Sequence, residues 1–148
     1  MEKLLISACL YGEKCRYDGK DNLIACLDLL KEKFTLIPIC PEVSGGLATP
    51  RNPSEIIGKS VVMNNGSDVT AEYKKGAVAA LKTALDNGCK VALMKAKSPS
   101  CGSGKIYDGT FSKTLVDGDG ITARLLKEHG IKVFDETQIS ELLEYIKA

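Results

Sequence analysis

Short apolar runs alternate with amphipathic segments along this chain, and this alternation constrains the fold more than any other feature. The apolar runs are KLLISACL (3–10), TLIPIC (35–40), VALMKA (91–96) and IKVF (131–134). Each has the length and near-continuous apolarity typical of a strand buried on both faces. Helical patterns separate or follow them: LIACLDLLKEKF after Asn22, the stretch from Thr70 to Gly88, ITARLLKEH after Gly120, and the closing TQISELLEYIKA. We therefore expect an α/β protein with a three-layer Rossmann-like fold, in which helices cover both faces of a mostly parallel sheet of about four strands.

The segment between the second apolar run and Thr70 does not fit this alternation. PEVSGGLATPRNPSE (41–55) contains three of the five prolines, so we expect a long loop. IIGKSVVMNNGSDVT (56–70) predicts two short strands or extended arms around an Asn65-Gly66 turn. Pro38 weakens the second strand slightly, because proline lacks one donor of the ladder.

Length and charge restrict the domain organisation and the class of partner. The 148 residues suit one domain, which we expect to span 1–148. The net charge of +1 and the absence of Trp argue against tight nucleic-acid binding. No run approaches the roughly 18 apolar residues of a membrane helix, and the N-terminal apolar patch is too short for a signal peptide. We expect a cytoplasmic protein that binds no membrane; the sequence predicts no oligomeric state.

Six cysteines in such a chain indicate metal binding or catalysis, since a reducing cytosol disfavours a disulfide framework. Cys9 ends the first apolar run, Cys40 ends the second, and Cys101 follows the third. The carboxyl ends of parallel strands meet at the edge of the sheet where ligands bind, so these three cysteines should converge there. Cys26 and Cys89 are expected to be inert core residues. Cys15 lies in a polar loop, where it is a fourth ligand, a resolving thiol or incidental.

The loop around Cys101, AKSPSCGSGKIYDG (96–109), has three possible roles: phosphate binding, nucleophilic catalysis and metal ligation. A Walker motif fails at two positions, because Pro99 stands where its first glycine belongs and Ile106 where its hydroxyl belongs. A cysteine nucleophile expects a histidine base, and His129, the single histidine, belongs to the end of a late helix. Metal ligation is the best-supported role.

Three thiolates are soft ligands that select zinc, copper(I) or an iron–sulfur cluster. Structural zinc requires a fourth ligand, for which Cys15 or Glu42 is available. A four-iron cluster on three cysteines instead leaves one iron without a protein ligand, and that iron can act as a Lewis acid on a soft sulfur atom. A zinc module using Cys9, Cys15, Cys40 and Cys101 and a metal-free thiol enzyme both stay open at this point.

Three spaced motifs resemble the signatures of the thiouracil desulfurase family. They are SACLYGEKCRYDG, ICPEVSGGLATPRNPSE and KSPSCGSGKIYDGTF, in collinear order over nearly the whole chain. The resemblance implies a compact α/β domain in which Cys9, Cys40 and Cys101 hold a [4Fe-4S] cluster. It also implies an enzyme that converts a small thio-substrate, a thiolated pyrimidine base, to uracil and hydrosulfide without net redox change.

Within that resemblance, an acid–base group must move protons, and Glu42 is our first candidate. Ser98 and Ser100 flank Cys101 and are candidates for orienting the substrate or bonding to cluster sulfides. Arg16, Asp18 and Arg51 are expected to form walls of the site or to pin two loops together, and Tyr17 to stack on a pyrimidine or to pack. Lys105, Tyr107 and Asp108 should lie near the same edge as a cover without a catalytic role.

Overall fold

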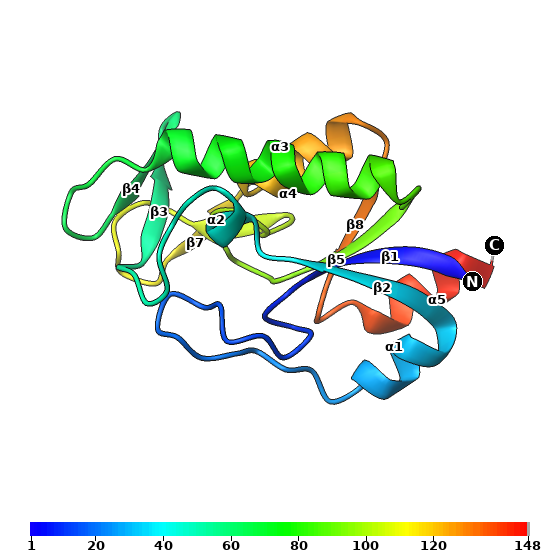
Figure 1. The fold of residues 1–148 in the computed structure, drawn as a ribbon. Helices are drawn as coiled ribbons and strands as arrows, with labels where there is room; N and C mark the ends of the chain where they lie inside the picture. Colours follow the sequence, from blue (N-terminus) through cyan, green and yellow to red (C-terminus); the bar gives the residue numbers. More distant parts are fainter. Residues whose placement is uncertain (148) are drawn as a thin grey trace.

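A four-stranded parallel sheet organises the computed structural model, which describes residues 1–147 (Figure 1). Its strands lie in the order β2-β1-β5-β8, where β1 is Glu2–Ser7, β2 Phe34–Ile39, β5 Val91–Met94 and β8 Lys132–Asp135. Each strand overlaps one of the four apolar runs and extends at most one residue beyond it, so the predicted α/β fold with a four-stranded parallel sheet is confirmed. Pro38 is tolerated because β2 is an edge strand.

Helices cover both faces of the sheet, as expected. Helices α1 (Leu27–Lys33) and α5 (Ile139–Lys147) lie on one face, and α3 (Thr70–Asp86) and α4 (Ile121–Glu128) on the other (Figure 1). Successive strand side chains point to opposite faces, so each strand contributes to two cores. In β1, Leu4 and Ile6 pack into the α1/α5 core, whereas Leu5 packs into the α3/α4 core.

Smaller elements gather beyond the carboxyl ends of the strands, at the left of Figure 1. They are the antiparallel pair β3 (Ser54–Ile57) and β4 (Ser60–Met63), the antiparallel pair β6 (Lys105–Tyr107) and β7 (Leu115–Asp117), and the short helix α2 (Pro41–Ser44). The β6–β7 pair and α2 were not predicted. Three-residue strands and one helical turn inside a Gly/Pro-rich segment leave almost no periodic signal.

Two local predictions need correction. The Asn65-Gly66 turn is present between paired arms, with an antiparallel bridge between Val62 and Asp68 and the Met63 N–H donating to the Ser67 carbonyl at 2.8 Å, but the two short strands do not flank it. These strands, β3 and β4, pair around Gly58-Lys59, where Gly58 has φ +63°, since two-residue hairpin turns favour residues that adopt positive φ. The first helix begins at Leu27 and not directly after Asn22, because Asn22 is engaged in the preceding loop, where its side chain accepts a hydrogen bond from Arg16 Nη1 at 2.9 Å.

Helix α2 packs against α3 with backbone touching backbone, and this contact fixes the start of the α2 segment. A Cβ at Gly76 of α3 would lie 1.9 Å from the Pro41 carbonyl oxygen. A Cβ at Gly45 would lie 2.0 Å from the Glu72 carbonyl oxygen. Only two glycines permit this approach. Their contact holds Cys40 and Glu42 over the first turns of α3.

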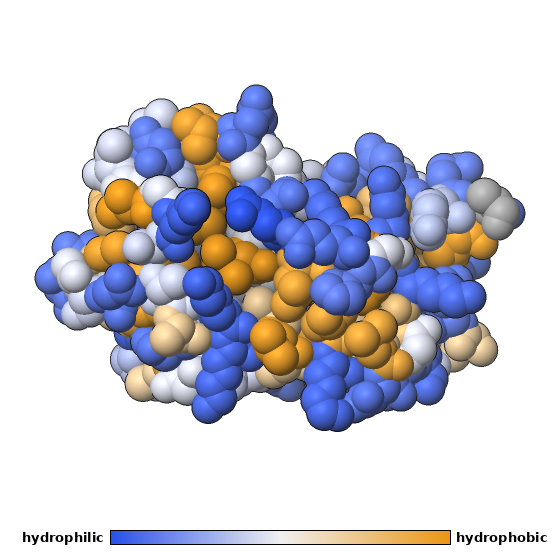
Figure 2. All heavy atoms as spheres, turned by 90° about the horizontal axis from the view of Figure 1, so that it is seen from above, coloured by the Kyte–Doolittle hydropathy of each residue, from blue (hydrophilic) through white to orange (hydrophobic). Residues whose placement is uncertain are grey.

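The α3 side of the molecule carries apolar side chains scattered among charged ones, as Figure 2 shows from above. Val78 and Leu85 of α3 are the most exposed of these. Single exposed apolar side chains are normal on globular proteins. Among the described residues, no helix has the length and apolarity needed to cross a membrane.

Candidate functional site

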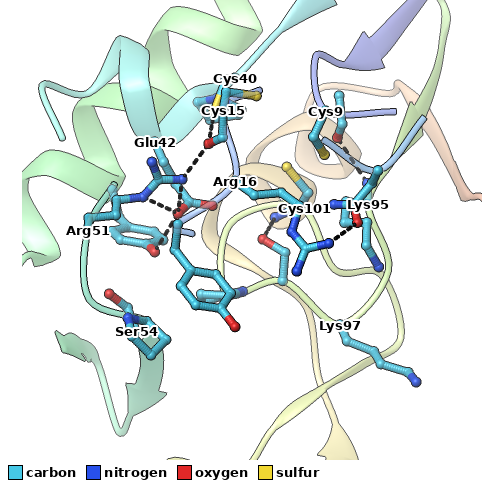
Figure 3. A pocket seen from close by; sticks show the side chains of 18 of the residues that line it. Cys9, Cys15, Arg16, Cys40, Glu42, Arg51, Ser54, Lys95, Lys97 and Cys101 are labelled. Atoms are coloured by element: carbon cyan, nitrogen blue, oxygen red, sulfur yellow. Dashed lines mark hydrogen bonds and ion pairs between the residues drawn. The ribbon is translucent and has the colours of Figure 1, made fainter. Parts of the chain in front are cut away.

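A pocket of about 630 Å³ opens at the carboxyl ends of β1, β2 and β5. The loops after these three strands form its base, and residues from the β3–β4 and β6–β7 regions form its outer walls (Figure 3). The chain places β2 on one side of β1 and then β5 and β8 on the other side. The pocket therefore lies at the topological switch point, where open α/β sheets bind ligands. The Ser7 hydroxyl accepts the Lys95 amide at 2.9 Å, which ties the ends of β1 and β5 together at the base of the pocket.

Four of the six thiols line this pocket: Cys9, Cys15, Cys40 and Cys101 (Figure 3). The convergence expected for the three strand-end cysteines is therefore present, and Cys15 joins them from the loop after β1. The other two lie elsewhere, as expected: Cys26 packs against the α1/α5 core and Cys89 is buried in the α3/α4 core.

Contacts among the thiols lower the pKa values of some of them and raise that of another. Hydrogen bonding from the Cys15 thiol lowers the pKa of Cys40 to about 7 and also lowers the pKa of Cys9. The same bonds hold the proton on Cys15 and raise its pKa. Burial raises the pKa of Cys101. Cys9 and Cys40 are thus the thiols closest to the ionised form that binds metals.

The Cys101 loop is a compact turn packed on the amino end of α4. Ser98 Oγ accepts the backbone N–H groups of Ser100 at 3.1 Å and Cys101 at 3.0 Å. The Ser100 carbonyl accepts N–H groups from the first turn of α4, including that of Thr122 at 2.9 Å. Because the turn satisfies the free donors of α4, the position of Cys101 is fixed relative to the sheet.

The two serines of this loop have different surroundings. Ser98 lines the pocket and uses both acceptor sites of its hydroxyl on the backbone, so its hydrogen stays available to donate. Ser100 is fully buried, and its hydroxyl lies 2.7 Å from Thr122 Oγ1. The structure therefore brings Ser98 to the thiols but does not bring Ser100 there, because its side chain turns toward α4.

Glu42 projects into the pocket from the first turn of α2, and three hydrogen bonds hold one of its two oxygens (Figure 3). Oε2 accepts Arg51 Nε at 3.1 Å, Arg51 Nη2 at 3.0 Å and the Tyr73 hydroxyl at 3.1 Å. Oε1 receives no hydrogen bond from the described residues. Burial raises the pKa of Tyr73, which keeps its hydroxyl protonated and able to donate. The carboxylate is thereby oriented with one oxygen unoccupied.

Arg51 pins two loops together, which is one of the two roles expected for it. Its Nη2 donates to the Cys15 carbonyl at 2.9 Å, and its backbone N–H donates to the Tyr17 carbonyl at 2.7 Å.

Arg16 acts within its own loop, donating to Asp18 and Asn22. Tyr17 and Tyr107 line the pocket, whereas Lys105 pairs with Asp117 on the exposed β6–β7 hairpin. Asp108 bonds to Thr110 at the start of the β6–β7 loop.

Several pocket residues carried no sequence signal. In the sequence, Tyr73 belongs to the amphipathic pattern of α3 and Lys95 lies at the end of an apolar run. Both nevertheless line the pocket. Ser54 lines it too, and its Oγ is the one buried side-chain oxygen or nitrogen of residues 1–147 without a hydrogen-bond partner. A water, an ion or a ligand in the pocket is the partner that such a buried atom requires.

The donor set is chemically suited to an iron–sulfur cluster. The thiols are soft donors, and Cys9, Cys40 and Cys101 come from three separate strand ends. Within residues 1–147, no group of three Cys, His, Asp or Glu side chains is arranged to hold a single metal ion. In a multi-iron cluster each cysteine binds a different iron, so its cysteines line one cavity without converging on a single point.

Comparisons with known proteins cover nearly the whole chain. The 2-thiouracil desulfurase family model matches residues 4–138. The uncharacterized protein YbbK of Bacillus subtilis (strain 168) is 39% identical over 150 residues, covering 95% of this chain and 99% of that protein. A solved structure of a [4Fe-4S]-dependent thiouracil desulfidase, TudS, is 47% identical, covers 99% of both chains and superposes with a TM-score of 0.94. With this match in sequence and in fold, the chain belongs to the 2-thiouracil desulfurase family.

Proposed function

We propose that this protein is a [4Fe-4S]-dependent thiouracil desulfidase. The substrate is a small thiolated pyrimidine, and water replaces its C=S group by C=O, giving uracil and hydrosulfide with no net oxidation or reduction. The observation that carries the proposal is the convergence of Cys9, Cys40 and Cys101, from three strand ends, in one pocket with Glu42. The family match and the similarity to TudS support the same activity.

In this proposal Cys9, Cys40 and Cys101 hold the cluster. When bound on three cysteines, such a cluster supplies a Lewis-acidic iron that polarises the thiocarbonyl of the substrate. Cys15 is not needed as a ligand. In the metal-free pocket, hydrogen bonding to Cys40 and Cys9 raises the pKa of Cys15, as burial does for Cys101, so the Cys15→Ser test below decides the role of Cys15 and its protonation does not.

Glu42 is the proposed proton carrier. Attack of water on the thiocarbonyl carbon releases a proton, and departure of sulfur requires one. Arg51 and Tyr73 occupy Oε2, so Oε1 is the oxygen that takes the proton from water and returns it toward the leaving sulfur. Because the carboxylate is held by three hydrogen bonds, it needs no reorientation between these steps.

Ser98 is the proposed hydrogen-bond donor beside Cys101. Its two acceptor positions are filled by the turn, which leaves only the hydroxyl hydrogen free to point into the pocket. That hydrogen can stabilise negative charge that develops on sulfur or oxygen during the reaction. Ser100 is not kept as a catalytic residue, because its hydroxyl is buried against Thr122.

Anaerobic reconstitution with iron and sulfide tests the proposal directly. Wild-type protein should gain about four irons and four sulfides per chain, the content of one [4Fe-4S] cluster, and should release hydrosulfide from thiouracil. Cys101→Ala should lose the cluster and the activity. Cys26→Ala is the matched control, because Cys26 packs against the α1/α5 core, and it should keep both. Wild-type protein that binds no iron, or that releases no hydrosulfide when fully loaded, would refute the proposal.

A non-catalytic zinc module using Cys9, Cys15, Cys40 and Cys101 is the second candidate. All four thiols line one pocket, which favours it, but within residues 1–147 no three of them are arranged to hold a single metal ion, so zinc binding would require them to move closer together. Cys15→Ser separates the two. The zinc module needs a fourth ligand and should lose its metal, whereas the three-cysteine cluster should survive the substitution with its iron content unchanged.

A further inference from the structure

The loop between β6 and β7, residues 108–114, is fastened to the β3–β4 hairpin by a buried carboxylate. Glu55 of β3 is only 8% exposed. Its Oε1 accepts the backbone N–H of Gly109 at 2.9 Å and that of Phe111 at 3.2 Å. A buried carboxylate is costly unless it is hydrogen-bonded, and here its recorded partners all belong to this loop. We call this pair of hydrogen bonds the Glu55 clasp.

The clasp holds the loop in a conformation that it does not favour by itself. Phe111 has φ +57°, in the left-handed region that is unfavourable for a residue with a Cβ. Gly109 approaches the hairpin so closely that a Cβ there would lie 2.8 Å from the Ile56 carbonyl oxygen. Two three-residue strands cannot hold a loop in place alone. Hydrogen bonds within the loop, such as that from the Asp108 N–H to the Thr114 carbonyl at 2.9 Å, shape the loop, and the Glu55 clasp joins it to β3. The position of Phe111 in the pocket wall therefore depends on Glu55.

The result of this arrangement is an aromatic ring in the wall of the pocket. Phe111 lines the pocket and is half-buried, whereas Thr110 and Ser112 on either side of it are exposed. The other aromatic residues there are tyrosines, and Tyr73 is already engaged with Glu42. Among the residues that line the pocket, Phe111 is thus the aromatic side chain that carries no polar group.

We propose that Phe111 stacks on the heteroaromatic ring of the thio-substrate and that Glu55 is the positioning residue that places it. The inference rests on the proposed function and adds its ring-binding determinant: the site selects a flat thiocarbonyl ring. An aromatic side chain in contact with a base contributes roughly 1–3 kcal/mol, about a 5- to 150-fold difference in affinity. The geometry assigns this contribution to Phe111.

The test compares Phe111→Ala, Phe111→Leu and Phe111→Tyr with wild type in the reconstituted holoenzyme. Phe111→Ala should raise KM for thiouracil 5- to 150-fold with little change in kcat. Phe111→Leu should resemble Phe111→Ala, because it restores bulk without a π face. Phe111→Tyr should stay within a few-fold of wild type. Leu115→Ala, on the exposed face of the same hairpin, is the matched control and should behave as wild type.

Calorimetric titration with uracil measures binding of the ring without turnover, so it tests Phe111 independently of the proposed desulfidase activity. Uracil has the ring but not the sulfur, so Phe111→Ala should weaken its binding by the same factor whether or not the enzyme turns over. Equal uracil affinity in wild type and Phe111→Ala, or full activity of Phe111→Leu, would overturn the inference. Wild-type protein that fails to bind uracil would overturn it as well.

Glu55 is tested through its effect on Phe111. Glu55→Ala should raise KM by about the same factor as Phe111→Ala, and the double variant should be no worse than either single one, since both remove the same contact. Glu55→Gln keeps an oxygen acceptor and should rescue most of the loss. Hydrogen exchange at the Phe111 amide should accelerate in Glu55→Ala but not in Leu115→Ala. Additive effects in the double variant would exclude a positioning role.

Discussion

The Tyr73 hydroxyl of α3 donates to Glu42 Oε2 at 3.1 Å, on the same oxygen that Arg51 binds through Nε and Nη2. This contact makes a helix residue distant in sequence responsible for the orientation of the proposed proton carrier. Tyr73→Phe removes one of the three hydrogen bonds while preserving the packing of the ring.

We expect Tyr73→Phe to lower kcat about 10-fold and to leave KM nearly unchanged, because the bond affects proton transfer and not substrate affinity. Steady-state hydrosulfide release at fixed cluster content measures this effect. The double variant Glu42→Gln/Tyr73→Phe should have the same kcat as Glu42→Gln alone, because Tyr73 acts only through Glu42. A Tyr73→Phe enzyme with wild-type kcat would show that Arg51 suffices to orient the carboxylate.

Gly76→Ala tests the backbone contact between α2 and α3. Alanine in place of glycine normally stabilises a helix interior by roughly 0.5–1 kcal/mol. Here the new Cβ would lie 1.9 Å from the Pro41 carbonyl oxygen, so α2 must move. We expect the free energy of unfolding to fall by about 2 kcal/mol or more, with a loss of activity as Glu42 shifts. Val78→Ala, at an exposed position of the same helix, is the control and should be nearly neutral in denaturant titration.

Ser98→Ala and Ser100→Ala should differ in their effect on the activity per loaded cluster. Ser98→Ala removes the proposed donor and should lower kcat per loaded cluster by about 10- to 100-fold. It also removes the acceptor of the Ser100 and Cys101 N–H groups, so part of its effect should be a loss of stability and of cluster content. Ser100→Ala should leave the activity per loaded cluster unchanged but cost about 1–3 kcal/mol of stability, because Thr122 Oγ1 loses its buried partner.

The combination of Ser100→Ala with Thr122→Val is the control for this pair of predictions. It removes both partners of the buried hydrogen bond and should recover most of the stability, as measured by thermal unfolding. Loss of activity in Ser100→Ala at full cluster content would return Ser100 to the catalytic residues.

The metal-free protein should show pH-dependent thiol chemistry. The pKa of Cys40 is about 7 in the folded chain against an ordinary 9.0, so its alkylation by iodoacetamide should reach half its maximal rate near pH 7. Buried Cys101, whose pKa is raised, should react slowly throughout. Mass spectrometry of the alkylated peptides measures both, and similar rates at the two residues would contradict the prediction.

The same shifts set the sign of the pH dependence of stability. Between about pH 7 and 9 the unfolded chain binds the proton that folded Cys40 has released, so stability should rise with pH across this window and be lost as pH falls through 7. Above pH 9 the raised pKa values of Cys15 and Cys101 act in the opposite direction. Denaturant titration of metal-free protein should therefore find its maximum near pH 9, and stability that falls steadily from pH 7 would contradict the sign.

Hydropathy pattern and chain order were enough to predict the sheet and the position of the pocket. The four apolar runs became the four parallel strands, and the long helix from Thr70 was predicted at its observed start. Because the carboxyl ends of parallel strands lie at one edge, residue order alone placed Cys9, Cys40 and Cys101 near one another. These properties depend on periodicity over a few residues and on strand direction, which a single sequence records.

Only the tertiary structure decided four features of the site. They are the position of the Cys15 thiol in the pocket, the hydrogen bonds that hold Glu42, the burial of Ser100 and the Glu55 clasp. Each joins segments that are distant along the chain: Cys15 with Cys40, Glu42 with Tyr73, Ser100 with Thr122, and Glu55 with Phe111. A local pattern cannot encode such pairs, because they depend on how closely two elements approach and which way each side chain turns. The contact between α2 and α3 at Gly76 shows the physical reason. Its geometry comes from the absence of one methyl group, which along the sequence is an ordinary glycine in a helix.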